Sequence, residues 1–391
     1  MKVGFLTSEY PHPKTGSSGG IGTSIKNLAT ALIEKGETVL VFVYGQNTDE
    51  MIADSGVKII RIKNVHFKGI SWWLTQKKIE RIINEQINKK NLDIIEVADW
   101  TGISAFMHLK CPVVMRLNGS DTFFCDLDKR PVKPWNKFLE KRAYKKADAI
   151  IAVSKFVGEN SNRLFMQNRG FIVIPNGIDL NKFSTLNADI FQHNNHILYF
   201  GTLIRKKGAL DLPLIFNKVY EHLPGAKLIV AGGDAADIST GSSSTWEIMK
   251  PLFSKKALSR VSYIGKIPYN EIKAQIEQAD ICVFPSYAEA CPVSWLEAMV
   301  MKKAIVASNI GWATEIIKDG VEGYLVNPRD HNLYADRILK LLNGTNLNRS
   351  IGSAASERIK NEFSNNIVAG KSLAFYTSVL QEVNDGGVSL L

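Results

Sequence analysis

The sequence has no long hydrophobic run and few cysteines, and both shortages narrow the class of protein. No apolar stretch in the 391 residues reaches the roughly 18–20 residues that a membrane-spanning helix needs. The first ten residues pass directly into a strand pattern, without the apolar region or cleavage site of a signal peptide. The four cysteines form no C-x-x-C pair: Cys111, Cys125, Cys282 and Cys291. We therefore expect a cytoplasmic protein with reduced thiols.

Two further absences concern ligands. No Asp-x-Asp pair stands beside a predicted strand end, so we expect no bound metal and no cofactor. No motif for binding DNA or RNA is visible. We interpret the basic clusters as runs of charge without aromatic side chains between them. Nucleic acid is therefore not expected as a partner. A nucleic-acid-binding protein would instead show steeply salt-dependent binding.

The composition is that of an ordinary globular protein, but its charge is unevenly distributed. The chain is 45% hydrophobic and 22% charged, and is long enough for two domains of about 150–200 residues. Residues 1–185 carry 27 Lys and Arg against 18 Asp and Glu, which leaves +9 of the total of +10. The basic clusters there are Lys77, Lys78 and Arg81; Lys89 and Lys90; and Lys137, Lys141, Arg142, Lys145 and Lys146. They could form a solvated helix face, a membrane-surface patch or a site for an anionic substrate.

Short apolar strand patterns alternate with amphipathic helical patterns in the first half. The strand patterns cover residues 2–7, 39–44, 57–62, 93–97, 112–117 and 149–153, and helical patterns cover about 21–36 and 71–90. This alternation predicts a parallel sheet with helices on both faces. The same pattern continues in the second half, with strands over 197–201, 226–233, 261–265, 281–284 and 304–307. Helices are predicted from about 210, over 271–279, from 293 and over 363–383.

Five polar side chains stand in loops that follow the predicted strands of the first half. They are Glu9, Asp99, Asn118, Asp121 and Ser154. Ligands of parallel sheets bind beyond the carboxyl ends of the strands, so these residues are candidates for contact with a substrate. Asp99 and Asp121 would serve equally well as loop or helix caps. Asn118 can hydrogen-bond a hydroxyl or phosphate but cannot act as a base, and no general base is assigned.

The first strand is followed by a loop rich in glycine, proline and serine, and then by a helix. This is the local plan of a nucleotide-binding unit, although the glycines do not follow the G-x-G-x-x-G pattern. Without Cβ atoms, Gly20 and Gly22 would let a phosphate or an acceptor approach the start of the helix. A flexible turn with no ligand is the alternative.

The most informative stretch runs from residue 281 to residue 328. A predicted strand leads through a loop into a helix, whose free N–H groups and dipole favour a phosphate. Glu289 lies in the loop, and Glu297 lies about one turn into the helix. Carboxylates repel a phosphate but accept hydrogen bonds from hydroxyls. One anion site, with a carboxylate on either side that accepts hydrogen bonds from hydroxyl groups, fits a nucleotide sugar.

Two motifs in the chain resemble those of a known enzyme family. Residues 289–297, EACPVSWLE, resemble the E-x7-E signature of retaining GT-B glycosyltransferases. Residues 172–179, IVIPNGID, resemble the V-I-P-N-G-[IV]-D signature of the same family. The family is the large, glycosyltransferase family 4-like group with sucrose and sucrose-phosphate synthases and many bacterial polysaccharide and lipid glycosyltransferases. The resemblance spans roughly residues 2–380.

The resemblance implies an α/β GT-B fold with two Rossmann-like domains facing across a cleft. We expect an acceptor-binding domain over residues 1–183 and a donor-binding domain over 184–365, with a polar linker near 180–195. Residues 366–391 would then form a helix that returns to the first domain, followed by a frayed tail.

The resemblance also assigns roles within the site. The catalytic candidates are Glu289, Lys207 and Arg205. The donor-binding candidates are Gly20, Gly22, Thr202, Gly265, Ala290, Cys291, Val293, Ser294 and Glu297, and the five loop residues of the first half would face the acceptor. Two positions depart from the family pattern: Thr202 stands where relatives have arginine, and Asn118 where many have histidine. Arg205 is a plausible substitute for the missing arginine, because guanidinium matches phosphate geometry.

The implied activity is transfer of a sugar, with retention of configuration, from a nucleoside diphosphate sugar to a hydroxyl. UDP is the expected nucleotide and a saccharide or lipid-linked saccharide the expected acceptor, in cell-surface polysaccharide or glycolipid assembly. The basic first half could make peripheral contact with an anionic membrane. A catalytically dead subunit on the same scaffold would bind nucleotide weakly or not at all. A nucleotide-sugar epimerase would convert the donor without any acceptor.

Overall fold

The computed structural model describes residues 1–16, 18–183 and 194–385, and these form two compact units. Unit 1 contains residues 1–178 and 364–391, and unit 2 contains residues 179–363. The sequence prediction places the boundaries at 183/184 and 365/366. The predicted linker falls largely on residues 184–193, which lie outside the described part of the chain. Of the predicted tail, residues 384–391, only residues 384 and 385 are described.

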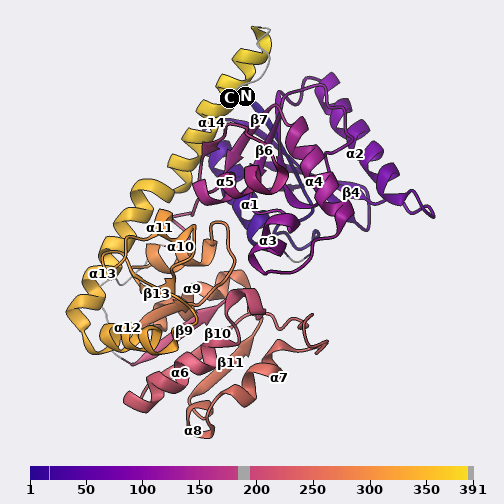
Figure 1. The fold of residues 1–391 in the computed structure, drawn as a ribbon. Helices are drawn as coiled ribbons and strands as arrows, with labels where there is room; N and C mark the ends of the chain where they lie inside the picture. The colour runs from indigo at the N-terminus through magenta and orange to yellow at the C-terminus, as the bar shows by residue number, and fades with distance from the viewer. Residues whose placement is uncertain (17, 184–193, 386–391) are drawn as a thin grey trace. The chain divides into compact units, whose positions relative to one another are not determined.

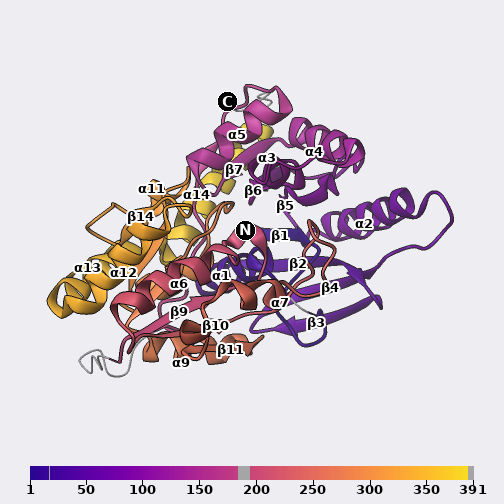
Figure 2. The ribbon, with the colours of Figure 1, turned by 60° about the horizontal axis from the view of Figure 1, so that its bottom comes forward.

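Unit 1 is built on an eight-stranded sheet with the order β3-β4-β2-β1-β5-β6-β7-β8 (Figure 2). Its strands are β1 (Lys2–Thr7), β2 (Thr38–Gln46), β3 (Glu50–Asp54), β4 (Val57–Lys63), β5 (Ile94–Ala98), β6 (Val113–Leu117), β7 (Ala149–Ala152) and β8 (Ile172–Val173). All pairs are parallel except the β3–β4 hairpin at one edge. The sequence analysis missed β3, because every second residue of this edge strand is exposed and its apolar signal is weak.

The helices of unit 1 connect successive strands. They are α1 (Gly20–Glu34), α2 (Ser71–Asn88), the 3₁₀ turn η1 (Trp100–Gly102), α3 (Asp121–Leu127), α4 (Pro134–Lys146), α5 (Lys155–Phe165) and the terminal helix α14 (Asn365–Asn384). One interpretation made from the sequence is wrong. Trp135 and Phe138 are interleaved with the lysines of α4 and stack on each other, so the basic clusters do contain aromatic residues.

The terminal helix α14 belongs to unit 1, as the resemblance implied, and is fixed there by a buried ion pair. Arg116 on β6 forms two hydrogen bonds with Glu96 on β5, at 2.7 and 2.9 Å, and both side chains are about 3% exposed. Tyr376 on α14 donates its hydroxyl to Glu96 at 2.5 Å, and Ser372 contacts Arg116 at 3.2 Å. A buried charge pair needs such additional partners, so the sheet and α14 depend on each other.

Unit 2 is built on a six-stranded, wholly parallel sheet with the order β11-β10-β9-β12-β13-β14 (Figure 1). Its strands are β9 (His196–Phe200), β10 (Lys227–Ala231), β11 (Val261–Gly265), β12 (Ile281–Phe284), β13 (Ala304–Ser308) and β14 (Tyr324–Val326). Its helices are η2 (Arg205–Lys207), α6 (Asp211–His222), α7 (Thr245–Met249), η3 (Lys250–Leu252), α8 (Lys255–Leu258), α9 (Tyr269–Gln278), α10 (Val293–Val300), α11 (Ala313–Ile316), α12 (His331–Asn343), α13 (Thr345–Arg358) and the π-helical η4 (Ile359–Phe363).

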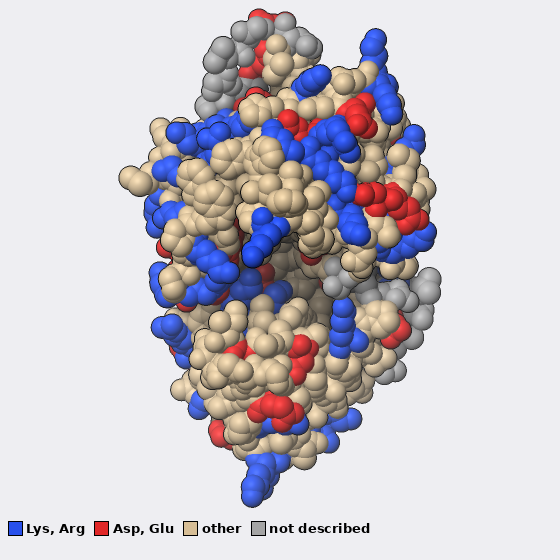
Figure 3. Space-filling model, turned by 90° about the vertical axis from the view of Figure 1, so that its right-hand side faces the viewer, with Lys and Arg blue, Asp and Glu red and all other residues tan. Residues whose placement is uncertain are grey.

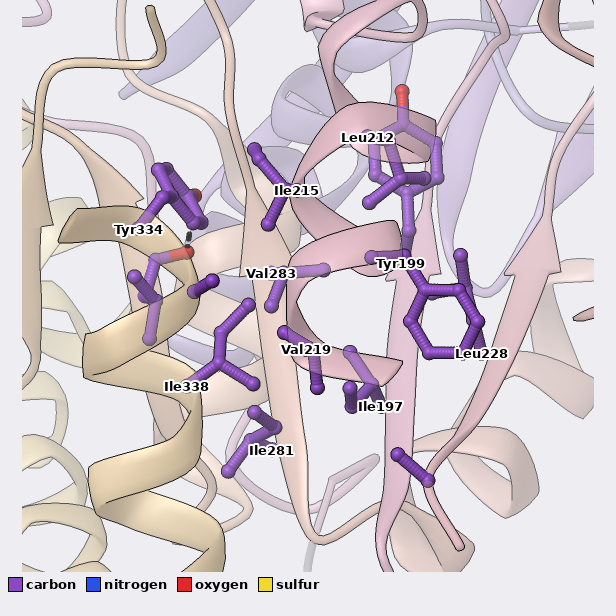
Figure 4. Close-up of a cluster of buried hydrophobic side chains, with 14 of the residues drawn as sticks. Ile197, Tyr199, Leu212, Ile215, Val219, Leu228, Ile281, Val283, Tyr334 and Ile338 are labelled. Carbon is purple, nitrogen blue, oxygen red and sulfur yellow. Dashed lines mark hydrogen bonds between the residues drawn. The ribbon is translucent and has the colours of Figure 1, made fainter. Parts of the chain in front are cut away.

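The core of unit 2 lies between its sheet and the helices α6 and α12. Figure 4 shows Leu212, Ile215 and Val219 of α6 over the strand residues Ile197 and Val283. Tyr334 of α12 is also buried, and its hydroxyl donates to the Val306 carbonyl at 2.7 Å. Strands buried on both faces read as continuous apolar runs, which is why these strands could be predicted from sequence. The packed sheet holds the ends of its strands, and the loops beyond them, in fixed positions.

Candidate active site

Unit 2 has a topological switch point where β9 lies between β10 and β12. The chain leaves β9 toward β10 on one side, while β12 begins the other half of the sheet. Open parallel sheets bind ligands beyond the carboxyl ends of their strands at such a point. The loops there are residues 201–208 after β9 and residues 285–292 after β12. Most of the predicted donor-site residues lie in these two loops or at the start of α10.

Two of the predicted catalytic residues are in contact. The Lys207 ammonium nitrogen lies 3.2 Å from Oε1 of Glu289, and their side chains are 26% and 13% exposed. The Ser286 hydroxyl lies 3.4 Å from the same carboxylate oxygen. Tyr199 lies beneath them, and burial followed by the Glu289 charge raises its pKa. A cation and a carboxylate therefore stand together in a partly desolvated position, where their interaction is stronger than in water.

Backbone contacts join the two loops independently of this ion pair. The N–H groups of Tyr287 and Ala288 both donate to the Lys206 carbonyl, at 2.7 and 3.2 Å. Gly208 has φ of +70°, and a Cβ there would come within 2.0 Å of the Pro285 carbonyl oxygen. Only glycine fits this position. The glycine after Lys207 thus lets the turn approach the β12 loop.

Helix α10 begins directly beside this pair of loops. Pro292 is its N-cap residue, and Val293 and Ser294 form its first turn. Ala290 and Cys291 are buried just before it, and Glu297 is buried in its second turn with only 4% exposure. A carboxylate is rarely buried without polar partners, so Glu297 is held in a defined position. Glu289 therefore lies in the loop before the α10 amino end, and Glu297 lies within the helix just after it.

The remaining donor-site candidates are arranged differently. Arg205 makes a bidentate contact with Asp237, at 2.6 and 2.9 Å. Its hydrogen bonds, followed by those from Thr240, lower the pKa of Asp237 to about 2. Thr202 is exposed, and Gly265 has φ of +70° with its carbonyl accepting from the Gly232 N–H. Asp237 carries no motif, and sequence reasoning missed it.

Unit 1 has its own switch point, where β1 lies between β2 and β5. Glu9 follows β1, and its carboxylate accepts hydrogen bonds from the N–H groups of Gly19, at 2.8 Å, and Gly22, at 2.9 Å. It thereby caps the amino end of α1 with a negative charge. Gly20 is exposed, with open space where a Cβ would lie. The two predicted glycines and Glu9 are thus brought together.

Asp99 and Asn118 also meet at this edge of unit 1. Both oxygens of Asp99 accept backbone N–H groups, from Asn118 at 3.0 Å and Gly119 at 3.1 Å. Burial raises the pKa of Asp99 to about 7, with the Glu140 charge adding to the rise against the effect of the two N–H donors. The Asn118 side chain is 9% exposed, and its buried Oδ1 has no hydrogen-bond partner. Such an acceptor is satisfied when a donor binds beside it.

Glu140 on α4 is a further polar residue of this region that sequence reasoning missed. Its carboxylate accepts from the N–H groups of Thr101, Asp121 and Thr122, at 2.9 to 3.2 Å. The side chain of Asp121 is in turn held by Asn136, at 3.0 Å, and Arg130, at 3.4 Å.

Ser154 caps α5 by accepting from the Val157 N–H at 3.3 Å. Several carboxyl and hydroxyl groups at this edge therefore hold the backbone in place.

Within residues 1–16, 18–183 and 194–385, no three His, Cys, Asp or Glu side chains are grouped as metal ligands would be. Over the same residues, no helix has the length and apolar character needed to cross a bilayer.

Comparison with known proteins gives the class. Residues 18–182 match the family model described as Glycosyltransferase Family 4, and residues 187–358 match the one described as Glycosyl transferases group 1. An uncharacterized glycosyltransferase of Methanocaldococcus jannaschii, MJ1178, is 25% identical over 98% of this chain and 99% of its own length. The chain is a glycosyltransferase.

Solved structures agree on the fold. The sucrose-phosphate synthase of Thermosynechococcus elongatus superposes with a TM-score of 0.78 at 20% identity, covering 97% of this chain and all of the other. Anabaena HepE, in complex with UDP and glucose, gives a TM-score of 0.73 at 20% identity with the same coverage. With both family models matched along its length, this chain belongs to the family 4 and group 1 glycosyltransferases of the GT-B fold.

The fit of Gly208 can be tested by adding a single methyl group. Gly208→Ala should destabilise the protein by about 3 kcal/mol, from a positive φ and a clash with backbone. Gly320→Ala is the matched control, since Gly320 has φ of +74° but open space around a Cβ, and should cost only about 1 kcal/mol. Urea unfolding measures both. Equal costs for the two variants would contradict the described fit.

The raised pKa of Asp99 predicts a pH dependence of stability. Between about pH 4 and pH 7 the folded state keeps a proton that the unfolded state has lost, so stability falls as the pH rises through this window. Asp99→Asn removes the titration, so its stability relative to wild type should increase with pH. Urea unfolding at a series of pH values measures this, with the exposed Asp336→Asn as control. A difference from wild type that stays flat from pH 4 to 7 would refute the assignment.

Proposed function

We propose that the protein transfers a sugar from a nucleoside diphosphate sugar to a hydroxyl acceptor, with retention of configuration. The observation that carries the proposal is the Lys207–Glu289 contact at the carboxyl ends of β9 and β12, next to the amino end of α10. A cation, a helix amino end and two carboxylates provide what a diphosphate and its two sugars need.

Unit 2 would bind the donor. The Lys207 ammonium and the N–H groups of Val293 and Ser294 would hold the diphosphate, whose negative charge grows as the bond to the sugar breaks. Pro292 has no N–H to donate, so the helix contacts begin at Val293. Glu289 would accept hydrogen bonds from sugar hydroxyls, sharing Lys207 with the diphosphate. Glu297 would accept from the ribose diol.

Arg205 has a more distant role in this proposal. Its guanidinium is already held by Asp237 through two hydrogen bonds. Binding a phosphate would require Arg205 to share its donors or to exchange one partner for another. We therefore assign Lys207 the principal contact with the diphosphate and place Arg205 at the rim of the donor site.

Unit 1 would bind the acceptor. The Asn118 Oδ1 is a buried hydrogen-bond acceptor without a partner, and a sugar hydroxyl would supply the missing donor. Asp99 holds the Asn118 and Gly119 N–H groups and so positions this side chain. Asn118 cannot serve as a base, and the Asp121 carboxylate is held by Asn136 and Arg130. We propose that the acceptor proton passes to the leaving phosphate, which is consistent with retention.

Several finer points are part of the same proposal. UDP is the nucleotide, by analogy with HepE in complex with UDP and glucose. The positive charge of Lys207 takes the place of a metal ion, and the nucleotide sugar is a co-substrate with no further cofactor. The acceptor is a saccharide or lipid-linked saccharide of cell-surface assembly, handled in the cytoplasm. The basic surface of unit 1 supports an anionic acceptor of this kind.

Donor binding can be tested by thermal stability with a panel of nucleoside diphosphates and nucleotide sugars. A ligand at about 100 times its Kd should add roughly 2.7 kcal/mol to the folded state. We expect a shift with uridine compounds that is reduced in Glu297→Ala and in the isosteric Glu297→Gln. The exposed helix residue Glu277 provides the control, Glu277→Ala, which should shift like wild type.

Two results would count against the proposal. One is the absence of a shift with every compound, in a sample whose unfolding is cooperative, which favours a non-binding subunit on the same scaffold. The other is an equal shift in wild type and both Glu297 variants, which would place the nucleotide elsewhere.

A further inference from the structure

An aromatic cluster lies on unit 1, and its rings come from α2, from α4 and from the segment after β5. Trp72 on α2 contacts Phe106 and Trp135, each with ring centroids 6.0 Å apart. Trp135 and Phe138, both on α4, stack at 5.4 Å with planes only 23° apart. Phe106 also contacts Phe138, at 6.4 Å. The cluster therefore joins the first turns of α2 and α4 with the segment after β5.

Much of this aromatic surface faces solvent. Trp135 is 56% exposed and Phe138 is 48% exposed. Trp73, on the next position of α2, is 48% exposed, and Phe67 and Ile70 in the loop before α2 are 62% and 46% exposed. Single exposed apolar residues are common in soluble proteins. Several large ones gathered at the tips of two adjoining helices indicate an interaction surface.

Basic side chains surround the aromatic residues, and we call the whole the aromatic-basic surface. It comprises Phe67, Lys68, Ile70, Trp72, Trp73, Phe106, Lys133, Trp135, Lys137, Phe138, Lys141, Arg142, Lys145 and Lys146. Within the described residues, no carboxylate pairs with Lys133, Lys137, Lys141 or Lys145, so their charges are available to a partner. Figure 3 views the side of unit 1 that carries α2 and α4, where Lys and Arg side chains border uncharged surface.

One member of the surface links the two kinds of side chain. The Arg142 guanidinium lies over the Phe106 ring, 4.4 Å from its centroid, and also donates to the Ala105 carbonyl at 3.0 Å. Lys146 donates to the Met107 carbonyl. Both cations are thereby fixed beside the aromatic cluster. Glu80 on α2, whose charge acts on Lys146, is paired with Lys77 at 2.8 Å.

We propose that the aromatic-basic surface docks unit 1 on a bilayer that contains anionic lipid. Tryptophan and phenylalanine rings insert at the boundary between headgroups and acyl chains, where amphipathic aromatic side chains are favoured. The lysines of α4 contact the anionic headgroups, and their long side chains reach past the rings. This docking brings a lipid-linked or membrane-bound substrate to the enzyme.

Charge complementarity selects this occupant over a second copy of the chain. Residues 134–146 carry five Lys or Arg against the single acidic residue Glu140, which is buried and occupied by backbone N–H groups. Two such surfaces placed against each other would repel. An anionic bilayer supplies the opposite charge and an apolar layer at once, which matches both kinds of side chain.

Sedimentation with lipid vesicles tests the docking with the full-length chain. The probes are vesicles of phosphatidylcholine alone and of phosphatidylcholine with 30% phosphatidylglycerol, at low and at physiological salt. We expect binding to the anionic vesicles at least tenfold stronger than to the neutral ones. Raising the salt should weaken the binding, because exposed charges are screened.

Two double variants separate the aromatic and the basic contributions. Trp135→Ser with Phe138→Ser, and Lys137→Glu with Lys141→Glu, should each weaken vesicle binding tenfold or more. The control is Arg81→Glu with Lys89→Glu, which makes the same change in charge on α2 and at its C-cap, and should stay within twofold of wild type. All variants should show the wild-type thermal shift with nucleotide, since docking and donor binding use different units.

The inference stands apart from the proposed transfer reaction, because vesicle binding is measured without any sugar donor. Equal losses in the control and in the Lys137 and Lys141 variant would overturn it, since binding would then follow net charge alone. Absence of binding to anionic vesicles would also overturn it. So would tighter binding to single-stranded nucleic acid or to a soluble glycan, or dimerisation lost in the aromatic variant.

Discussion

The candidate site of unit 2 depends on one contact, the ion pair of Lys207 and Glu289. It joins the loops at the carboxyl ends of β9 and β12, which are neighbours in the sheet although more than 80 residues separate them in the chain. Backbone bonds from Tyr287 and Ala288 to the Lys206 carbonyl support it, and so does the close approach permitted by Gly208. The sheet thus brings a cation to the amino end of a helix, where anions bind.

The switch-point loops of unit 1 resemble those of unit 2, but their backbone N–H groups have different partners. The unit 1 loops also present backbone N–H groups, but carboxylates of the chain itself accept many of them. Glu9 caps α1, Glu140 caps α3, and Asp99 holds the turn after β6. These hydrogen bonds stabilise the loops, and the Asn118 Oδ1 stays without a partner. In the proposed function, unit 2 therefore binds the anionic donor and unit 1 binds the hydroxyl groups of the acceptor.

Sequence reasoning predicted the regular parts of this architecture well. Strand β12 begins and ends as predicted and helix α10 begins as predicted, because buried apolar runs and helical periodicity are local signals. The E-x7-E spacing singled out Glu289 and Glu297, and the resemblance to the family singled out Lys207; their roles in a site stay predictions.

Contacts between residues that lie far apart in the sequence could not be predicted. Asp237 and Glu140 carry no motif, and their roles arise from partners that lie 32 residues away for Asp237 and as many as 39 for Glu140. The aromatic cluster also joins side chains from three separate segments, so its aromatic residues do not form a run in the sequence.

The most direct test of the central claim is the release of nucleoside diphosphate from a panel of nucleotide sugars. The purified protein would be supplied with a glycan and lipid extract, and wild type would be compared with Glu289→Gln. The account predicts that one donor is consumed only when the extract is present, and that Glu289→Gln loses this activity while still binding the nucleotide. Conversion of a donor to its isomer without any extract, or turnover that is unchanged in Glu289→Gln, would contradict it.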